Sequence, residues 1–168
     1  MVSFPMRIPF NLYVTMSDAL EEKSRELWEL EYARRIEQDV MDGMVEMPKP
    51  DDRRKDPRLQ LRRGKNIWIH TDRVPVPILN ISKSGVAFFS EQQYFPGDHL
   101  HLSVANTLTI KARVLECEME ETDAIFMEYR YHVRAKFDEG ENGCKIYVLA
   151  RDIYRHDLDK PFTTYRLN

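Results

Sequence analysis

Two periods of apolar residues divide the chain into a helical part and a strand-rich part. Between residues 17 and 42 apolar side chains recur every four residues, as on one face of an α-helix. This stripe consists of Trp28, Tyr32, Ile36 and Val40, with Leu20 and Leu27 beside it. Acidic residues in the first turns and Gly43 just past the end fit helix termini, and Thr15 or Ser17 is the expected N-cap. We therefore predict one amphipathic helix at about residues 17–42.

From residue 66 onward the apolar residues follow period two or form short runs between turn residues, as in β-strands. The predicted strands span residues 66–71, 74–81, 86–90, 99–104, 108–118 and 125–137. Short strands at regular spacing are typical of a small antiparallel barrel. Ile146, Leu149 and Ile153 have helical spacing, so a short C-terminal helix is expected to close one barrel end. The predicted fold class is mainly β, with a six-stranded antiparallel barrel, a C-terminal helix and an N-terminal helical extension.

Length and composition favour one domain with an appendage. The 168 residues, 42% of them hydrophobic, suffice for one core. Met47 to Asp52 contains two prolines and no apolar period, so we expect a linker there. We place the N-terminal extension at residues 1–50, with a strand or extended clasp over residues 1–16, and the barrel domain with its helix at residues 51–168.

Charge and cysteine content restrict the function classes. The net charge of −3 argues against general nucleic-acid binding, but residues 49–73 hold nine Lys or Arg against four Asp. Cys117 and Cys144 lie far apart and no histidine has metal-ligand spacing, so neither a zinc site nor a disulfide framework is expected. No run approaches the about 18 apolar residues of a membrane helix. We expect a cytoplasmic protein that has no cofactor and does not insert into membranes.

Two motifs carry the candidate chemistry. The first is the cationic cluster Arg53-Arg54-Lys55-Asp56-Pro57-Arg58, and the second is the glycine turn Asn80-Ile81-Ser82-Lys83-Ser84-Gly85. Guanidinium groups bind phosphates and the O6/N7 edge of guanine in bidentate fashion. Asn80 offers an amide, Ser82 a hydroxyl, and the missing Cβ of Gly85 allows close approach to the backbone. Together the motifs indicate a site for an anion that carries guanine.

The combination of Arg-Arg-x-x-x-Arg and Asn-x-Ser-x-x-Gly about two dozen residues later resembles the signature of PilZ domains, which are bacterial receptors for the second messenger cyclic di-GMP. The resemblance covers roughly residues 51–155 and implies a six-stranded barrel followed by a helix. It implies that Arg54 and Arg58 bind guanine edges and phosphates, and that Asn80, Ser82 and the backbone near Gly85 contact the other guanine and the ribose-phosphate. Asn80 departs from the family pattern, in which Asp is commoner at this position.

The resemblance also implies a mechanism. The residue before the first signature arginine influences whether one ligand or a stacked pair is bound, and an arginine at that position, Arg53, favours the pair. Ligand binding is expected to order the arginine-rich linker and to reposition residues 1–50, which signals to a protein partner. Arg113 and Arg134 are interpreted as outward-facing strand residues outside the site.

Other function classes stay open at this point. A PilZ-fold adaptor would act by protein contact alone, through Trp28 and Tyr32. The helix stripe is expected to pack on its own domain or on a second copy in a homodimer, rather than on another protein. A barrel that binds RNA or single-stranded DNA would use Trp68, Phe88 and Phe89 for stacking, although their spacing favours the core. No catalytic motif is recognised, so we do not expect an enzyme.

Overall fold

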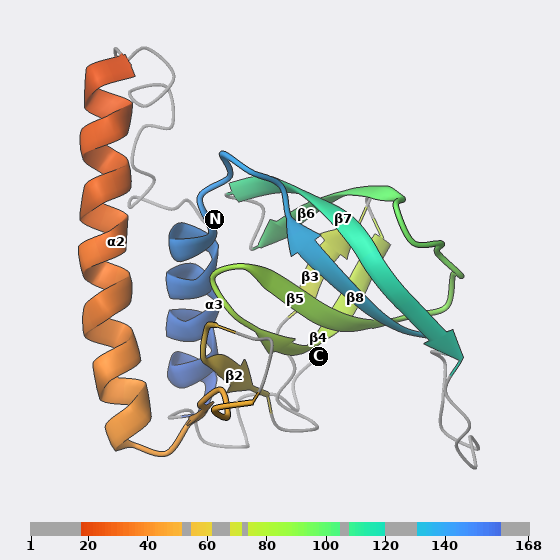
Figure 1. The fold of residues 1–168 in the computed structure, drawn as a ribbon, viewed down its shortest axis with the longest axis horizontal. Coiled ribbons are helices and arrows are strands. Elements are labelled where there is room, and N and C mark those ends of the chain that lie inside the picture. Colours follow the sequence, from red (N-terminus) through yellow and green to blue (C-terminus); the bar gives the residue numbers. More distant parts are fainter. Residues whose placement is uncertain are drawn as a thin grey trace, which may run out of the picture.

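The computed structural model describes residues 18–51, 55–61, 68–71, 74–104, 108–119 and 131–158. Within these ranges two helices stand beside a curved antiparallel sheet (Figure 1). The helices are α2 (Asp18–Met41) and α3 (Gly143–Leu158). The strands are β1 (Val45–Glu46), β2 (Arg58–Gln60), β3 (Trp68–Thr71), β4 (Val74–Ile81), β5 (Gly85–Ser90), β6 (His99–Val104), β7 (Leu108–Met119) and β8 (Tyr131–Phe137).

Six of the strands close into a barrel. Their order is β4-β3-β6-β7-β8-β5, and β5 pairs back onto β4, so the ring has no free edge among these strands. All of the pairings are antiparallel. The end of β4 also pairs with β2, through Leu59 and Ile81, and β2 pairs with β1. The predicted six-stranded antiparallel barrel with a C-terminal helix is therefore confirmed.

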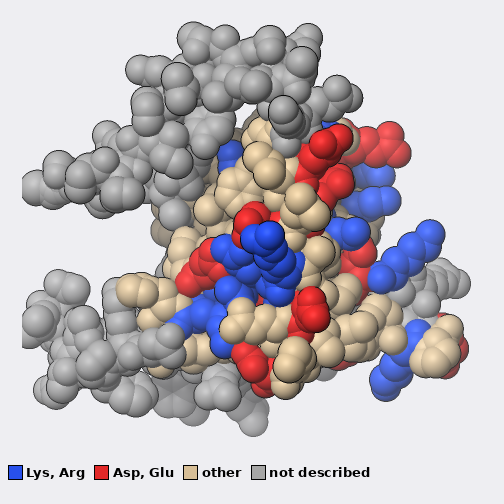
Figure 2. Space-filling view, turned by 90° about the vertical axis from the view of Figure 1, so that its left-hand side faces the viewer, with Lys and Arg blue, Asp and Glu red and all other residues tan. Residues whose placement is uncertain are grey.

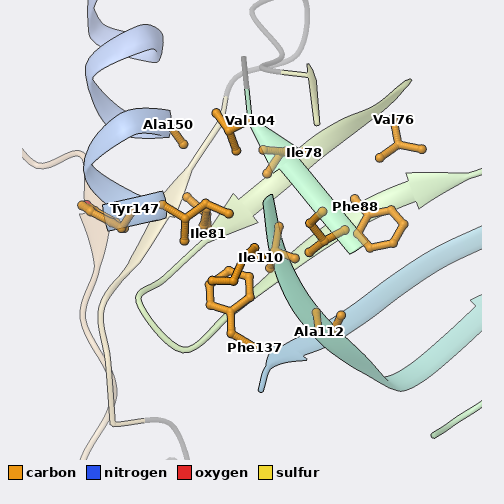
Figure 3. Packing of buried hydrophobic residues seen from close by; sticks show 14 of the residues in the cluster. Val76, Ile78, Ile81, Phe88, Val104, Ile110, Ala112, Phe137, Tyr147 and Ala150 are labelled. Atoms are coloured by element: carbon orange, nitrogen blue, oxygen red, sulfur yellow. The ribbon is translucent and has the colours of Figure 1, made fainter. Parts of the chain in front are cut away.

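Alternation along the strands fills the barrel interior. In β6 and β7 every second side chain is buried, with Leu100, Leu102, Ile110 and Ala112 at 0 or 1% exposure. The helix α3 closes one end, since Tyr147 and Ala150 lie beside the barrel residues Ile81 and Val104 (Figure 3). Each fully buried aliphatic or aromatic side chain contributes about 1.5–3 kcal/mol to folding. The barrel and α3 thus share one hydrophobic core.

The helix α2 packs on α3, which lies between α2 and the barrel (Figure 1). Trp28, Tyr32 and Ile36 pack against the shared core. The two other stripe positions with described side chains are exposed in this chain, Val40 at 41% and Leu27 at 60%. The reason is geometric: a helix that packs on a single neighbour buries only a narrow stripe.

A buried polar network fixes α2 on α3. Asp39 is fully buried, and its carboxylate accepts hydrogen bonds from Tyr147, Arg151 and Arg155 of α3 at 3.0–3.2 Å. One helical turn earlier on α2, Arg35 donates hydrogen bonds to Asp152 of α3 at 3.1 and 3.2 Å. Because removing one partner of a buried ion pair leaves the other uncompensated, this network favours one register of the two helices.

The end of α2 is the glycine stop that the sequence predicts. Gly43 has φ +69°, and the N–H groups of Gly43 and Met44 donate to the carbonyls of Val40 and Asp39. These bonds form a Schellman motif, which satisfies the last carbonyls of the helix. On the side of α2, Lys and Arg alternate with Asp and Glu over the surface (Figure 2). No helix in the described ranges is long and apolar enough to cross a membrane.

The structure adds two strands and leaves some predictions untested. β1 and β2 were not predicted, because elements of two and three residues show no measurable period. Arg58 is the first residue of the paired strand β2. The sequence instead assigned it, with Arg53 and Arg54, to the arginine-rich linker. Several predictions lie outside the described residues: the clasp over residues 1–16, the N-cap at Thr15 or Ser17, the side chain of Leu20, and the strand residues 66, 67 and 125–130.

Candidate ligand-binding site

A solvent-open hollow of about 170 Å³ lies on the outer face of the barrel. Its walls come from the segment before β2, from the β4–β5 turn, and from β5, β7 and β8. The lining residues are Lys55, Asp56, Arg58, Asn80, Ser82, Ser84, Gly85, Val86, Ala87, Leu115, His132, Arg134, Ala135 and Lys136. Four of these are Lys or Arg and one is Asp, so the hollow is suited to an anion.

The β4–β5 turn is folded around one hydroxyl. Ser82 Oγ accepts hydrogen bonds from the backbone N–H groups of Ser84 and Gly85, both at 3.2 Å, and Ser82 N donates to the Gly85 carbonyl at 2.9 Å. Ser84 Oγ lies 3.1 Å from Ser82 Oγ. Ser82 is 6% exposed, so its hydroxyl mainly shapes the turn. The turn therefore presents Asn80 and Ser84 to the hollow from a rigid support.

Gly85 is required by close packing rather than by an unusual backbone angle. Its φ is not positive, whereas Gly43, Gly97 and Gly140 in the described ranges have positive φ. A β-carbon on Gly85 would lie 2.5 Å from the carbonyl oxygen of Ala135 on β8. Since β5 and β8 are paired at this point, any side chain would separate the two strands beneath the hollow.

The strand β8 provides a row of polar side chains. His132, Arg134 and Lys136 alternate with the inward-facing Val133 and Ala135, so all three are on the outer face. Arg134 pairs across the sheet with Ala87 of β5, whose small side chain leaves room above the sheet. This row was missed in the sequence analysis, which placed Arg134 outside the site. The period-two spacing of residues 132, 134 and 136 indicates that they share one face of β8. It does not indicate that this face lies beside β5, which is what brings them to the hollow.

A carboxylate already pairs with this cationic row. Arg134 Nη1 donates to Glu116 Oε2 at 2.6 Å, and both side chains are about 40% exposed, at 43% and 40%. Hydrogen bonding with Glu118, and then with Arg134, lowers the pKa of Glu116. Glu116 lies beside the β7 irregularity between Val114 and Glu116, where Leu115 is the unpaired residue. A phosphate that enters the hollow would compete with Glu116 for the Arg134 guanidinium.

The hollow unites four of the six residues predicted from the sequence. Arg58, Asn80, Ser82 and Gly85 all line it, although residues 58 and 80 are separated by 22 positions in the chain. Arg53 and Arg54 lie outside the described residues. The ten other lining residues were not predicted as site residues: Lys55, Asp56, Ser84, Val86, Ala87, Leu115, His132, Arg134, Ala135 and Lys136. Described residues from both motifs thus lie at one surface.

The remaining candidate residues have mostly structural positions. Phe88 is fully buried in the core, whereas Phe89 is partly exposed and its ring lies 5.8 Å from that of His132. The side chain of Trp68 lies outside the described residues. Cys117 and Cys144 are both unpaired thiols, and burial raises the pKa of Cys144. No cluster of metal-ligating side chains occurs in the part of the chain that the structure describes.

Comparison with known proteins gives one family match. The family model for the PilZ domain matches residues 52–147, which is more than half of the chain. None of the curated proteins compared with the chain matches it significantly.

Solved structures show weaker likeness. MrkH, described as a c-di-GMP-dependent transcription regulatory factor, is 18% identical with a TM-score of 0.44, and the match covers 65% of this chain and 53% of MrkH. The complex of K. pneumoniae MrkH with c-di-GMP gives 17% identity, a TM-score of 0.44, and coverages of 64% and 53%. The PilZ domain of YcgR from Escherichia coli, solved with c-di-GMP, is 14% identical with a TM-score of 0.47. This match covers 66% of this chain and 100% of the YcgR domain. The chain thus spans about half the length of MrkH, and these likenesses are too low to assign a ligand.

Proposed function

Because the chain belongs to the PilZ domain family, we propose that it is a receptor for cyclic di-GMP. The observation that carries the proposal is the meeting of Arg58 with Asn80, Ser82 and Gly85 in one hollow with a surplus of cations. Cyclic di-GMP is a dianion with two guanines. Arginine side chains bind phosphates and the guanine edge, and the asparagine amide can both donate and accept hydrogen bonds. Membership of a family of receptors also supports a non-enzymatic role.

In this proposal Arg54 and Arg58 bind guanine edges and phosphates. Asn80, the small exposed part of Ser82 and the backbone near Gly85 contact the second guanine and its ribose-phosphate. Because Gly85 has no β-carbon, β5 can lie close to Ala135 of β8. Arg134 and Lys136 add two cations to the phosphate side of the same hollow. Arg53, next to Arg54, provides a further guanidinium for a stacked pair of ligands, whose four phosphate charges it helps to offset.

The volume of the hollow is smaller than that of pockets that enclose a drug-sized ligand, which is about 300–1,000 Å³. At about 170 Å³ it holds one face of a dinucleotide and leaves the other accessible. We propose that the segment with Arg53 and Arg54 closes over this accessible face and becomes ordered by the ligand. The ordering would signal to a protein partner of the chain, which we expect to work in the cytoplasm.

The adaptor hypothesis, without nucleotide binding, meets a specific obstacle. Of its proposed contact residues, Tyr32 is only 8% exposed, and Trp28 is partly buried against the core. An adaptor would therefore have to release α2 or use other residues. With these residues packed within the chain, a homodimer through α2 would have to use exposed side chains such as Leu27 and Leu30, which are 60% and 59% exposed.

The proposed function is tested by isothermal titration of the protein with cyclic di-GMP, with GTP and cyclic di-AMP as controls. We expect selective binding, and a ratio near two ligands per chain would support the role given to Arg53. Arg58→Ala, and likewise Arg54→Ala, should bind at least about tenfold more weakly, since a hydrogen bond to a charged group is worth about 1.5–3 kcal/mol.

The matched control is Arg34→Ala, which removes a guanidinium with 74% side-chain exposure on α2. It should bind as the wild type does. Circular dichroism should show all three variants folded. Absence of binding by titration and by a second method would reject the receptor and favour the adaptor, whereas unfolding of Arg58→Ala would assign that arginine a structural role.

A further inference from the structure

The turn that lines the hollow has a second side, which faces the helices. Ser82 and Ser84 line the hollow, but Lys83 between them does not. The side chain of Lys83 reaches α2, where its Nζ lies 5.3 Å from the centroid of the Tyr32 ring. Tyr32 packs edge-on against Tyr147 of α3, with ring centroids 5.1 Å apart. Lys83 therefore joins the ligand-facing turn to the interface between the two helices.

The backbone makes the same connection. A β-carbon on Gly143, the first residue of α3, would lie 1.7 Å from the carbonyl oxygen of Lys83. The neighbouring Ser84 carbonyl accepts a hydrogen bond from Phe137 N at 2.9 Å. The turn itself is tied together through the Ser82 hydroxyl. A displacement of this turn thus acts directly on the first turn of α3, because close-packed backbone leaves no free space.

Lys83 also contacts the other wall of the hollow. Its Nζ lies 3.8 Å from Asp56 Oδ1, and Asp56 lines the hollow two residues before Arg58. The ammonium group therefore lies between a carboxylate on the ligand side and an aromatic ring on the helix side. The same carboxylate acts on Tyr32: burial first, and then the charge of Asp56, raise the pKa of this phenol. An anion in the hollow repels Asp56, which changes what Lys83 contacts.

The two halves of α2 are attached with unequal strength. The C-terminal half is fixed by the fully buried Asp39 and its bonds to α3. The N-terminal half has no comparable buried ion pair among its described side chains: Trp28 is only partly buried against the core, and beside it are Arg25 Nη2, 2.6 Å from the Gly140 carbonyl, and Lys145 Nζ, 5.5 Å from the Trp28 ring. A perturbation at Tyr32, between these halves, is therefore expected to move the N-terminal half around the Asp39 anchor.

We propose that Lys83 is a positioning residue that couples occupancy of the hollow to the seating of α2 on α3. This rests on the proposed function and adds its route of transmission. A bound dianion displaces Asp56 from Lys83, the cation moves relative to Tyr32, and the N-terminal half of α2 shifts with Trp28. Because coupling of two equilibria is reciprocal, the seating of α2 also changes the affinity for the ligand.

The test uses the full chain labelled with 5-fluorotryptophan, in which Trp28 and Trp68 are the two tryptophans. Fluorine NMR follows Trp28, assigned with Trp28→Phe, while cyclic di-GMP is added, and calorimetry measures binding on the same samples. In the wild type the Trp28 resonance should shift with the same midpoint as the calorimetric binding. Lys83→Met should bind within about fivefold of the wild type yet lose the shift, and Lys83→Arg should restore it.

The matched control is Lys111→Met, an exposed lysine of β7 that does not line the hollow, and it should behave as the wild type does. A normal Trp28 shift in Lys83→Met, or wild-type binding without any Trp28 shift, would overturn the coupling and leave the receptor intact. Loss of binding in folded Lys83→Met would also overturn it, because Lys83 would then act in the site itself. Failure of the wild type to bind would reject the receptor, and the coupling with it.

Discussion

The carbonyl oxygen of Lys83 occupies the space into which a side chain of Gly143 would point. A β-carbon at residue 143 would lie 1.7 Å from this oxygen and 2.8 Å from the carbonyl carbon, so one of the two backbones would have to move. The contact joins the β4–β5 turn to the start of α3, and it explains why the buried first residue of this helix is a glycine.

Gly143→Ala should therefore destabilise the protein by about 1–3 kcal/mol, the usual cost of overpacking, although alanine favours the helical state elsewhere. Urea unfolding followed by circular dichroism measures the difference. A matched control is Ser24→Ala in α2, whose partly exposed side chain should change stability by less than about 0.5 kcal/mol. A Gly143→Ala variant as stable as the wild type would show that the turn and α3 are not packed this tightly.

The second prediction concerns the anchor of α2. Asp39→Ala leaves the guanidinium of Arg151, 8% exposed, without its buried carboxylate, so we expect a loss of about 3–5 kcal/mol in unfolding free energy. Asp42→Ala is the comparison, because Asp42 pairs with Arg155 at 2.8 Å but has 41% side-chain exposure and should cost less than about 1 kcal/mol. Equal losses in the two variants would mean that burial of the Asp39 pair adds nothing.

The third prediction follows from Asp152. Burial raises the pKa of this carboxyl, but hydrogen bonds from Arg35 and Arg151 outweigh burial, and the folded-state pKa lies below its usual value. The unfolded chain thus binds the proton more tightly, so the contribution to stability is present above about pH 4 and disappears as pH falls through the folded-state pKa. Asp152→Asn should weaken the acid dependence of stability below about pH 4, as measured by urea unfolding at several pH values. An unchanged acid dependence would contradict this assignment.

The fourth prediction concerns the ion pair at the edge of the hollow. Glu116→Gln releases Arg134 from its 2.6 Å contact and removes a negative charge, so cyclic di-GMP should bind about two- to fivefold more tightly at low salt. Glu91→Gln, which neutralises an exposed carboxylate outside the hollow, should leave affinity nearly unchanged. Weaker binding by Glu116→Gln would mean that the carboxylate positions Arg134 for the ligand instead of competing with it.

The elements that could be predicted from the sequence are those in which periodicity extends over several residues. The six barrel strands and both helices fall in this class, and Gly43 ends α2 as predicted. β1 and β2 could not be predicted, since their few residues take their conformation from pairing with β4 rather than from local pattern. The exposure of Val40 likewise depends on how α2 packs on α3, which no local pattern encodes.

The candidate site divides in the same way. Arg58, Asn80, Ser82 and Gly85 belong to motifs that are continuous in the sequence. Arg134 and Lys136 come to the hollow only because β8 pairs with β5, so their position depends on long-range strand pairing. The role of Lys83 is hidden for the same reason, since its contacts with Tyr32 and Gly143 span 51 and 60 positions of the chain.

The most direct test of the central claim is an amide NMR titration of the full chain with cyclic di-GMP. The account predicts that the largest shifts fall on Arg58, on the turn from Asn80 to Gly85, and on the outward positions of β8 such as Arg134, because these residues line one hollow. Shifts confined to another surface, or no shifts at millimolar ligand, would contradict the claim that this hollow binds the dinucleotide.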